Sequence, residues 1–407
     1  MTTKPVDYQA IKNHIATHED AMVRFLRDMV AIPSESAEER DVIARIRQEM
    51  EDVGFDEVIV DGLGNIRGRM GSGAHVLAMD AHVDTVGIGD PGTWEHDPYE
   101  GKLEDGVIYG RGAADQEGGM AAMVYGAKAI KDLDLAGDYQ LWVTGTVMEE
   151  DCDGLCWQYL LREKILTPEV VVITEPTNLH VYRGHRGRME LEVRTQGKSA
   201  HGAMPHLGDN AIYKMGPIIA DIERLNERLD DTADPFLGKG TCTISDIRST
   251  SPSLCAVADS CTIHVDRRLT VGEDEASSVA ELLALPSVKA AEAEVTVLDY
   301  ARESYTGLVY PTKKYYPTWV VKEDAPITRA SMEVAGGVLD DAPILGRWDF
   351  STNGVATCGM FDVPTIGFGP GNEIHAHTTE DQCPVDDLRK AAAFYAAFPK
   401  VYLATKA

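Results

Sequence analysis

MDAHVDTVGIGD (residues 79–90) and YGRGAADQEGG (residues 109–119) are the stretches around which this chain is organised. In the first, a short apolar strand ends in a His-x-Asp pair, His82 and Asp84. In the second, a glycine-rich turn after another short strand carries Asp115. Open α/β sheets place their ligand sites at the carboxyl ends of strands. The two stretches therefore predict an α/β fold with a site at that edge of its sheet.

In the first part of the chain, segments whose apolar residues have helical spacing alternate with segments whose apolar residues have strand spacing. Ser36 is the expected N-cap of one of these helices. Strands alternating with helices are typical of a mainly parallel central sheet flanked by helices. The expected helices are residues 7–30, 36–53, 118–133 and 153–163, and the expected strands are residues 57–60, 65–69, 75–79, 139–148 and 170–174.

The pattern changes near residue 183, where a β-α-β-β-α-β order begins. This order is the split βαβ, or ferredoxin-like, arrangement, for which about 115 residues suffice. We therefore predict an inserted α+β domain over residues 183–297, and a larger domain built from residues 1–182 and 298–407. In the last part we expect helices at residues 319–323, from residue 328 and at 385–403, and an apolar strand within residues 355–367.

Composition argues against several classes of partner. The 407 residues include 38 Lys or Arg and 66 Asp or Glu, for a formal net charge of −28. This charge disfavours nucleic acid and anionic membranes, and no run approaches the roughly 20 apolar residues that span a bilayer. The first 22 residues lack the apolar core of a signal peptide. The seven cysteines are scattered without a CxxC pair, so we expect reduced thiols and a cytoplasmic protein.

Acidic or histidine side chains follow several of the expected strands. They are His82, Asp115, Glu149, Glu150, Glu175 and His377. Each alone could be a solvated loop residue or a helix cap. Oxygen and imidazole ligands together suit zinc, manganese or cobalt, and the lack of cysteine among them favours a catalytic site over a closed structural one.

Five motifs in this order, AHVDTV, YGRGAADQEGG, EE, TEP and AHTTED, resemble those of the co-catalytic metallopeptidase and deacylase family. That family includes acetylornithine deacetylase, succinyl-diaminopimelate desuccinylase, aminoacylase and glutamate carboxypeptidase. The resemblance extends to GKSAHGAMP and VDRRLTVGE in the predicted insert. SLCAVADSCTIHVDRRLT and WDFSTNGVAT are most similar to the subgroup linked by name to selenium metabolism. The resemblance implies a catalytic domain and an inserted domain that serves as a dimerisation or lid domain.

The resemblance also implies two divalent metal ions, with zinc expected and cobalt or manganese as alternatives. The implied ligands are His82, Asp115 and Glu175 for one ion and Asp115, Glu150 and His377 for the other. Asp115 would bridge the ions, which lie about 3.5–4 Å apart in two-metal sites. His377 is preferred to His375 because the family has an acidic residue four positions after its ligand histidine. Here that residue is Asp381, where glutamate is usual.

Three further residues have implied roles in catalysis. Asp84 would accept the second ring N–H of His82 and fix its tautomer. Glu149 would be the general base that deprotonates the metal-bound water and returns the proton to the leaving amine. His201 would reach across a homodimer to polarise the substrate carbonyl, the alternative being a turn histidine.

Two departures from the family pattern bear on the substrate. Cys255 begins a segment where many members have Asn-x-x-Pro-Asp, and Val355 stands where deacylases often carry arginine. Substitute contacts are therefore expected from elsewhere, with surface or interdomain salt bridges as the alternative for each arginine. The candidate substrate-binding residues are Arg186, Arg268, Arg347, Asn353 and Gly371.

The sequence thus predicts a dinuclear metallohydrolase that cleaves an amide bond of a small peptide or N-acyl amino acid. A metal-bound hydroxide would attack the carbonyl, with Glu149 as the general base. Hydrolysis of a carbamoyl or ureido C–N bond at the same site is the enzymatic alternative. A non-enzymatic binding protein is disfavoured because every implied ligand and the base are present.

Overall fold

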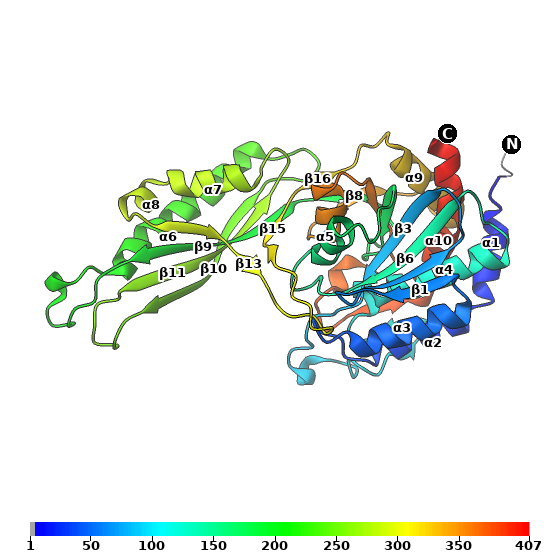
Figure 1. Cartoon of the computed structure of the whole chain (residues 1–407), viewed down its shortest axis with the longest axis horizontal. Coiled ribbons are helices and arrows are strands. Elements are labelled where there is room, and N and C mark those ends of the chain that lie inside the picture. The colour runs from blue at the N-terminus through cyan, green and yellow to red at the C-terminus, as the bar shows by residue number, and fades with distance from the viewer. Residues whose placement is uncertain (1–4, 407) are drawn as a thin grey trace.

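The computed structural model describes residues 5–406 and contains two separate hydrophobic cores. Figure 1 shows an elongated molecule with a large lobe that carries both termini and a smaller lobe at the other end. The larger core draws on residues 11–182 and 316–402, whereas the smaller one draws on residues 189–293. The chain therefore leaves the large lobe once and returns to it.

A nine-stranded sheet forms the centre of the large lobe. Its central strands β6, β3, β7 and β18 run parallel, and its antiparallel pairs lie toward the edges. This arrangement confirms the predicted α/β class and places the ends of the central strands at one edge. In spatial order the strands are β1 (Glu57–Val60), β2 (Ile66–Met70), β6 (Tyr139–Thr146), β3 (His75–His82), β7 (Val170–Ile173), β18 (Thr365–Gly367), β8 (Val181–His185) and β16 (Trp319–Val320), with β17 (Leu345–Trp348) beside β8.

Helices surround this sheet, and the last helix packs directly along α4. They are α1 (Tyr8–Ala16), α2 (Glu19–Val30), α3 (Arg40–Val53), α4 (Gly118–Asp132), α5 (Leu155–Arg162), α9 (Pro326–Val338) and α10 (Val385–Lys406). Smaller pairings complete the lobe: β4 (Lys102–Glu104), β5 (Val107–Tyr109) and β19 (Gln382–Pro384) form one sheet, and β13 (Asp299–Tyr300) pairs with β14 (Thr312–Lys313).

The small lobe is an antiparallel sheet with helices packed against it. Its strands are β10 (Thr241–Thr250), β11 (Ser260–Leu269), β9 (Gly187–Gln196) and β12 (Glu294–Val297), with β15 (Tyr315–Tyr316) paired to β9. Its helices are α6 (Ala211–Arg228), α7 (Glu275–Ala284) and α8 (Pro286–Ala290). Alternate residues of β9 are buried under them, as expected for a sheet with one face on the core. The strand β8 ends at His185 and belongs to the large sheet, so residues 183–185 are not part of the small sheet. The boundaries 183–297 of the inserted domain therefore stay our proposal.

Several local predictions were wrong. The helix expected over residues 7–30 is divided into α1 and α2 at residues 17–18. Ser36 does not cap α3, because that helix begins at Arg40 and the Ser36 hydroxyl instead donates to Asp84 Oδ2 at 2.7 Å. The helix expected at residues 319–323 is the edge strand β16, which pairs with β8. Within residues 355–367, only β18 is a strand, and it follows a π-helical turn, η5 (Val355–Met360).

None of the helices within residues 5–406 is long and apolar enough to cross a membrane.

An aromatic stack joins α10 to the sheet. Phe368, next to β18, stacks on Phe394 with ring centroids 3.9 Å apart, and Phe398 and Tyr402 continue the stack along the helix. The Tyr395 hydroxyl donates to the carbonyl of Phe368 at 2.6 Å. These contacts connect the last helix to a strand next to β7, which leads into the site.

We predict that Phe394→Ala lowers the free energy of unfolding of the large lobe by about 3–5 kcal/mol, because it leaves a cavity in this stack. Thermal unfolding followed by circular dichroism measures the effect. The matched control is Leu254→Ala, at a fully exposed side chain, which should change stability by no more than about 0.5 kcal/mol. Equal effects of the two substitutions would contradict this account of the stack.

Candidate metal centre

The acidic and histidine side chains gather at the carboxyl ends of the central strands. His82 is the last residue of β3, Glu149 and Glu150 follow β6, and Glu175 lies two residues after β7. Asp115 lies in the kinked turn η2 (Ala113–Glu117), directly before α4. His377 follows the short turn η6 (Glu373–His375). Parallel strands bring these side chains together because their carboxyl ends share one edge of the sheet.

The two carboxylate oxygens of Asp115 face different partners. Its Oδ1 lies 3.0 Å from His82 Nε2, and Glu175 Oε1 is 3.5 Å from the same nitrogen. Its Oδ2 lies 3.3 Å from His377 Nε2, which is also 2.9 Å from Glu150 Oε2. The structure thus brings together all five predicted ligands as two His–Glu pairs with Asp115 between them.

Unpaired oxygens show that these residues fit a cation site. Glu149 Oε1 and Glu175 Oε2 are buried without a hydrogen-bond partner among the described residues. A buried carboxylate oxygen without a donor is costly. Single ligand atoms of His82, Glu149 and Glu175 lie within 4.8 Å of one another, as do those of His82, Asp115 and Glu150. Nitrogen and oxygen donors at this spacing suit divalent zinc, cobalt or manganese.

The electrostatics of the cluster also favour cations. Burial and the charge of Asp115 raise the pKa of Glu175 to about 8, and the same causes raise the pKa of Glu150. Hydrogen bonds to Asp115 and Glu150 raise the pKa of His377 to about 10. Burial opposes ionisation of Asp115, but hydrogen bonds from His377 and His82 lower its pKa. The raised pKa values mean that protons on these side chains balance the negative charge of the crowded carboxylates. A divalent ion that binds to the cluster displaces these protons.

Asp84 has a different contact from the predicted one. His82 Nδ1 lies 2.8 Å from the backbone carbonyl of Asp84, whereas the Asp84 carboxylate is 3.6 Å away. That buried carboxylate instead accepts hydrogen bonds from Ser36 Oγ and from the backbone N–H groups of Glu149 and Glu150, at 2.7, 3.1 and 3.0 Å. Asp84 therefore positions the turn that carries the two glutamates, and its carbonyl orients His82.

Asp381 supports the opposite side of the cluster. Its buried carboxylate accepts hydrogen bonds from Arg111 Nη1 at 3.1 Å and from the backbone N–H groups of Gly112 and Ala114 at 2.8 and 2.9 Å. Gly112 has a φ of +87°, which favours glycine. Because Asp115 follows directly, Asp381 fixes the turn that presents it.

A cavity of about 330 Å³ opens over the cluster between the two lobes. Its lining includes Arg188 and Arg268 from the small sheet and Asp153, Phe350 and Glu373 from the large lobe. Of the arginines predicted to contact substrate, only Arg268 lines this cavity. Arg188, Asp153, Phe350 and Glu373 were missed, because none of them has a spacing typical of a metal or catalytic site, although Phe350 lies within WDFSTNGVAT. The fold alone brings these side chains to the cavity.

The other residues predicted to contact substrate do not line the cavity. Arg186 donates to the carbonyl of Lys239 at 3.0 Å, and Arg347 donates to the carbonyl of Leu237. Gly371, with φ +77°, donates its N–H to Asp387 Oδ2 at 3.2 Å.

Asn353, a predicted substrate contact, has partners within the protein. Its buried amide donates to Asp80 Oδ2 at 2.9 Å and to Thr146 Oγ1 at 3.1 Å, and its oxygen accepts from the N–H of Gly154. All of these partners belong to the large lobe. The side chain is therefore occupied in holding this lobe together beneath the cluster.

Two more histidines lie away from the cluster. His201 is exposed in the small lobe, where its Nδ1 accepts from the backbone N–H of Ala203 at 3.1 Å, and it does not line the cavity. The ring of His375 contacts Gln382 Nε2 at 3.1 Å and does not line the cavity, whereas His377 does.

Comparison with known proteins identifies the family and the fold. The profile of Peptidase family M20/M25/M40 matches residues 78–400. An uncharacterized Escherichia coli K12 protein, YgeY, is 52% identical over 403 residues, which cover 99% of this chain and 100% of that protein. A probable succinyl-diaminopimelate desuccinylase of Staphylococcus epidermidis is 34% identical over 198 residues, 48% of this chain and 49% of that one. The crystal structure of Bacillus subtilis YXEP, described as a dinuclear metal binding peptidase, superposes with a TM-score of 0.70 at 12% identity, covering 96% of this chain and 99% of YXEP.

We predict that Asp381→Asn weakens zinc binding about 10–100-fold. The carboxylate of Asp381 now accepts hydrogen bonds from N–H donors, and the NH₂ group of the new amide would face those donors and could not accept from them. Equilibrium dialysis of the whole protein against buffered zinc, with atomic emission as the readout, measures the affinity. Glu380→Gln changes the exposed neighbouring carboxylate and should leave the affinity unchanged. Native zinc affinity in Asp381→Asn would show that the turn holds Asp115 without this carboxylate.

Proposed function

The chain belongs to peptidase family M20/M25/M40 and is a hydrolase of the peptidase and deacylase type, and we propose that it hydrolyses an amide bond of a small peptide or N-acyl amino acid. The observation that carries this proposal is the position of Asp115 between two His–Glu pairs. The unpaired Oε1 of Glu149 belongs to a carboxylate that lies beside the His82–Glu175 pair. Such an arrangement combines a place for two cations with a separate proton acceptor.

The proposed metal ligands are the five residues of the cluster. His82 and Glu175 would hold one ion, Glu150 and His377 would hold the other, and Asp115 would contact both. Two divalent ions bound there, zinc being our proposal, would supply polarisation of the amide carbonyl and activation of a water molecule. The chain itself orients the ligands through the hydrogen bonds of Asp84 and Asp381.

Glu149 is the proposed general base. Burial raises its pKa well above the usual value, and the charges of Asp153 and Glu175 act in the same direction, against the opposing effect of His82. A base works best when its pKa lies near the working pH. Its Oε1 has no other hydrogen-bond partner among the described residues. It is therefore free to take a proton from the attacking water and to deliver it to the leaving nitrogen.

The cavity supports a small, charged substrate. A volume of about 330 Å³ is at the lower end of the range for small-molecule sites. Arg268 lines the cavity and is partly exposed, with its guanidinium paired to Asp266 at 2.8 Å. We propose Arg268 as a contact for an anionic end of the substrate.

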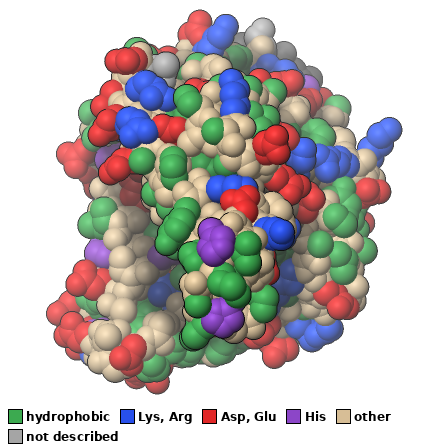
Figure 2. Space-filling view, turned by 90° about the vertical axis from the view of Figure 1, so that its left-hand side faces the viewer, with side chains coloured by type: hydrophobic (Ala, Val, Ile, Leu, Met, Phe, Trp, Pro, Cys, Tyr) green, Lys and Arg blue, Asp and Glu red, His purple; other side chains and the backbone are tan. Residues whose placement is uncertain are grey.

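Homodimerisation through the small lobe is proposed to bring His201 to the site of a second chain. The strand β10 lies at the edge of its sheet, and most of its residues are exposed. Tyr213, at the start of the neighbouring α6, is 79% exposed, and Ile247 on β10 is 53% exposed. Figure 2 shows hydrophobic and histidine side chains at the surface of this end of the molecule. An exposed edge strand beside apolar side chains is a typical place for association.

We predict that Glu149→Ala keeps its zinc content but lowers the rate of amide hydrolysis by about 10²–10⁴-fold or more, because the proton acceptor is lost. Dipeptides, N-acyl amino acids and carbamoyl amino acids should be assayed side by side. Glu163→Ala, at an exposed glutamate outside the cavity, is the control. Full activity of Glu149→Ala would remove Glu149 from the mechanism, and exclusive cleavage of carbamoyl substrates would replace the proposed reaction with its alternative.

Mixing of subunits tests the role of His201. Glu149→Ala and His201→Ala proteins should each be nearly inactive, whereas an equal mixture that has exchanged subunits should recover about a quarter of native activity, since half of its dimers would contain one complete site. Size-exclusion chromatography with light scattering checks the dimer. A mixture as inactive as its components would show that His201 does not act across subunits.

A further inference from the structure

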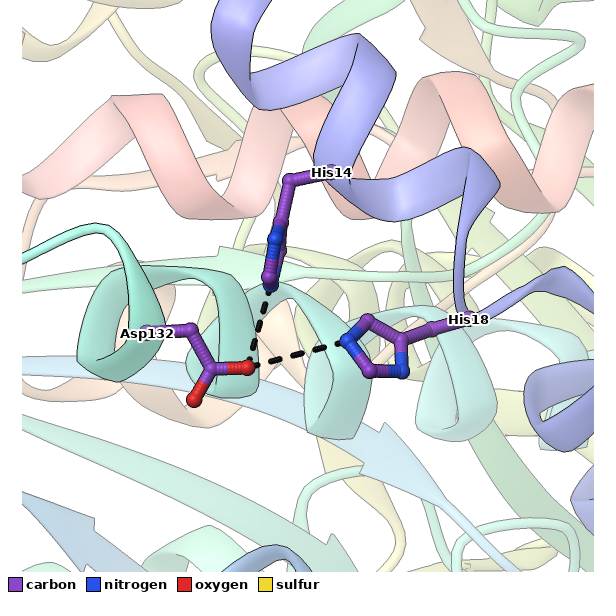
Figure 3. Close-up of side chains that lie close together, drawn as sticks. All are labelled: His14, His18 and Asp132. Atoms are coloured by element: carbon purple, nitrogen blue, oxygen red, sulfur yellow. Dashed lines mark hydrogen bonds and ion pairs between the residues drawn. The ribbon is translucent and has the colours of Figure 1, made fainter.

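A second group of metal-ligand side chains lies among the N-terminal helices. His14 is in the last turn of α1, His18 directly precedes α2, and Asp132 is the last residue of α4. Figure 3 shows both imidazole rings directed at one oxygen of the Asp132 carboxylate. We propose that these three residues form a separate binding site for a single transition-metal ion that imidazole prefers, such as Zn²⁺.

The spacing of the donor atoms fits one ion. His14 Nε2 lies 3.1 Å and His18 Nε2 lies 3.6 Å from Asp132 Oδ2, and ligand atoms of all three residues are within 4.8 Å of one another. Two ligands that bind one tetrahedral zinc at 2.0–2.1 Å are about 3.3 Å apart. The side chains are 20%, 26% and 28% exposed, respectively. An ion can therefore reach them from solvent without opening the fold, and water can complete its coordination.

Asp132 Oδ2 already has cationic or N–H partners. Lys128 Nζ lies 2.9 Å from the same Oδ2 that both histidines approach. Lys128 and His14 thus occupy the two lone pairs of this oxygen, and His18 Nε2, at 3.6 Å, lies beyond hydrogen-bond distance. An ion at this place would contact the carboxylate and both imidazoles, because each imidazole Nε2 can donate a lone pair to a metal, and the Lys128 ammonium would remain as a competitor for Asp132.

The local electrostatics favour a cation. Both α1 and α4 end at this place, and the carboxyl end of a helix carries a partial negative charge, whereas the partial positive charge at the start of α2 acts in the opposite direction. Asp132 adds a full negative charge to the end of α4. Burial, together with the charges of Lys128 and His14, lowers the pKa of His18.

The proposed site is distinct from the catalytic cluster. Asp115 lies three residues before the start of α4, and Asp132 is at the other end of this 15-residue helix. Those ends are about 22 Å apart at the rise of an α-helix. A bound ion would connect the turn between α1 and α2 to the end of α4. Its effect should therefore be on metal stoichiometry and on stability, with amide hydrolysis unchanged.

Zinc stoichiometry tests the site in the full-length protein. The catalytic cluster is first saturated, free Zn²⁺ is then increased by equilibrium dialysis, and bound zinc per chain is measured by atomic emission. Native protein should bind one zinc ion more than the His14→Ala/His18→Ala variant and should show a zinc-dependent rise in Tm that the variant lacks. His75→Ala is the matched control, because His75 forms a single His–carboxylate pair with Glu169 at 2.8 Å, and it should bind as much zinc as the native protein.

Two single substitutions keep the test decisive if the double variant does not fold. Asp132→Asn retains an oxygen for the imidazole N–H groups but loses the negative charge, and it should lose the additional zinc. Lys128→Gln removes the competing ammonium and should bind that zinc more tightly than the native protein. Equal zinc binding by native protein and Asp132→Asn, or an unchanged affinity in Lys128→Gln, would overturn the assignment and leave the three residues as a hydrogen-bonded helix junction.

Discussion

The crowding of four carboxylates and two histidines at the end of one sheet is the constraint on which the site depends. Asp115, Glu149 and Glu175 are at most 6% exposed, so water cannot screen their mutual repulsion. Histidine protons offset part of the charge, but some oxygens remain without a donor. Burying unpaired carboxylates costs folding free energy unless cations bind. The same crowding that destabilises the empty cluster therefore makes it a strong site for divalent ions.

A second set of buried acids has the opposite role. Asp80, Asp84 and Asp381 each accept several hydrogen bonds from backbone or side-chain donors. These bonds determine where the turns after β3, β6 and β5 place their side chains. Satisfied acids thus build the scaffold, whereas Glu149 and Glu175 in the cluster are left with unpaired oxygens. Burial does not separate these two roles, because both sets are buried.

The sequence predicted the cluster but not its surroundings, and the reason is local geometry. His82, Glu149 and Glu175 come soon after apolar strands, so the direction of the chain alone brings them to one edge. Asn353 and Ser36 could not be predicted in this way, since their partners Asp80 and Asp84 lie more than forty residues away in the chain. The segment after residue 318 has the short apolar pattern that fits helix and strand equally well. Pairing with the edge of β8 decides between them.

Specificity is harder to predict because the cavity belongs to neither lobe alone. Arg188 of the small sheet forms an ion pair with Asp153 of the large lobe at 3.0 Å, and its guanidinium lies 5.0 Å from the centre of the Tyr316 ring. Both partners are largely buried, so separating them would leave an uncompensated charge. This pair holds the cationic residues of the small lobe over the acidic cluster. The motifs that specify the reaction are confined to strand ends of one lobe, whereas the substrate contacts depend on how two separate sheets meet.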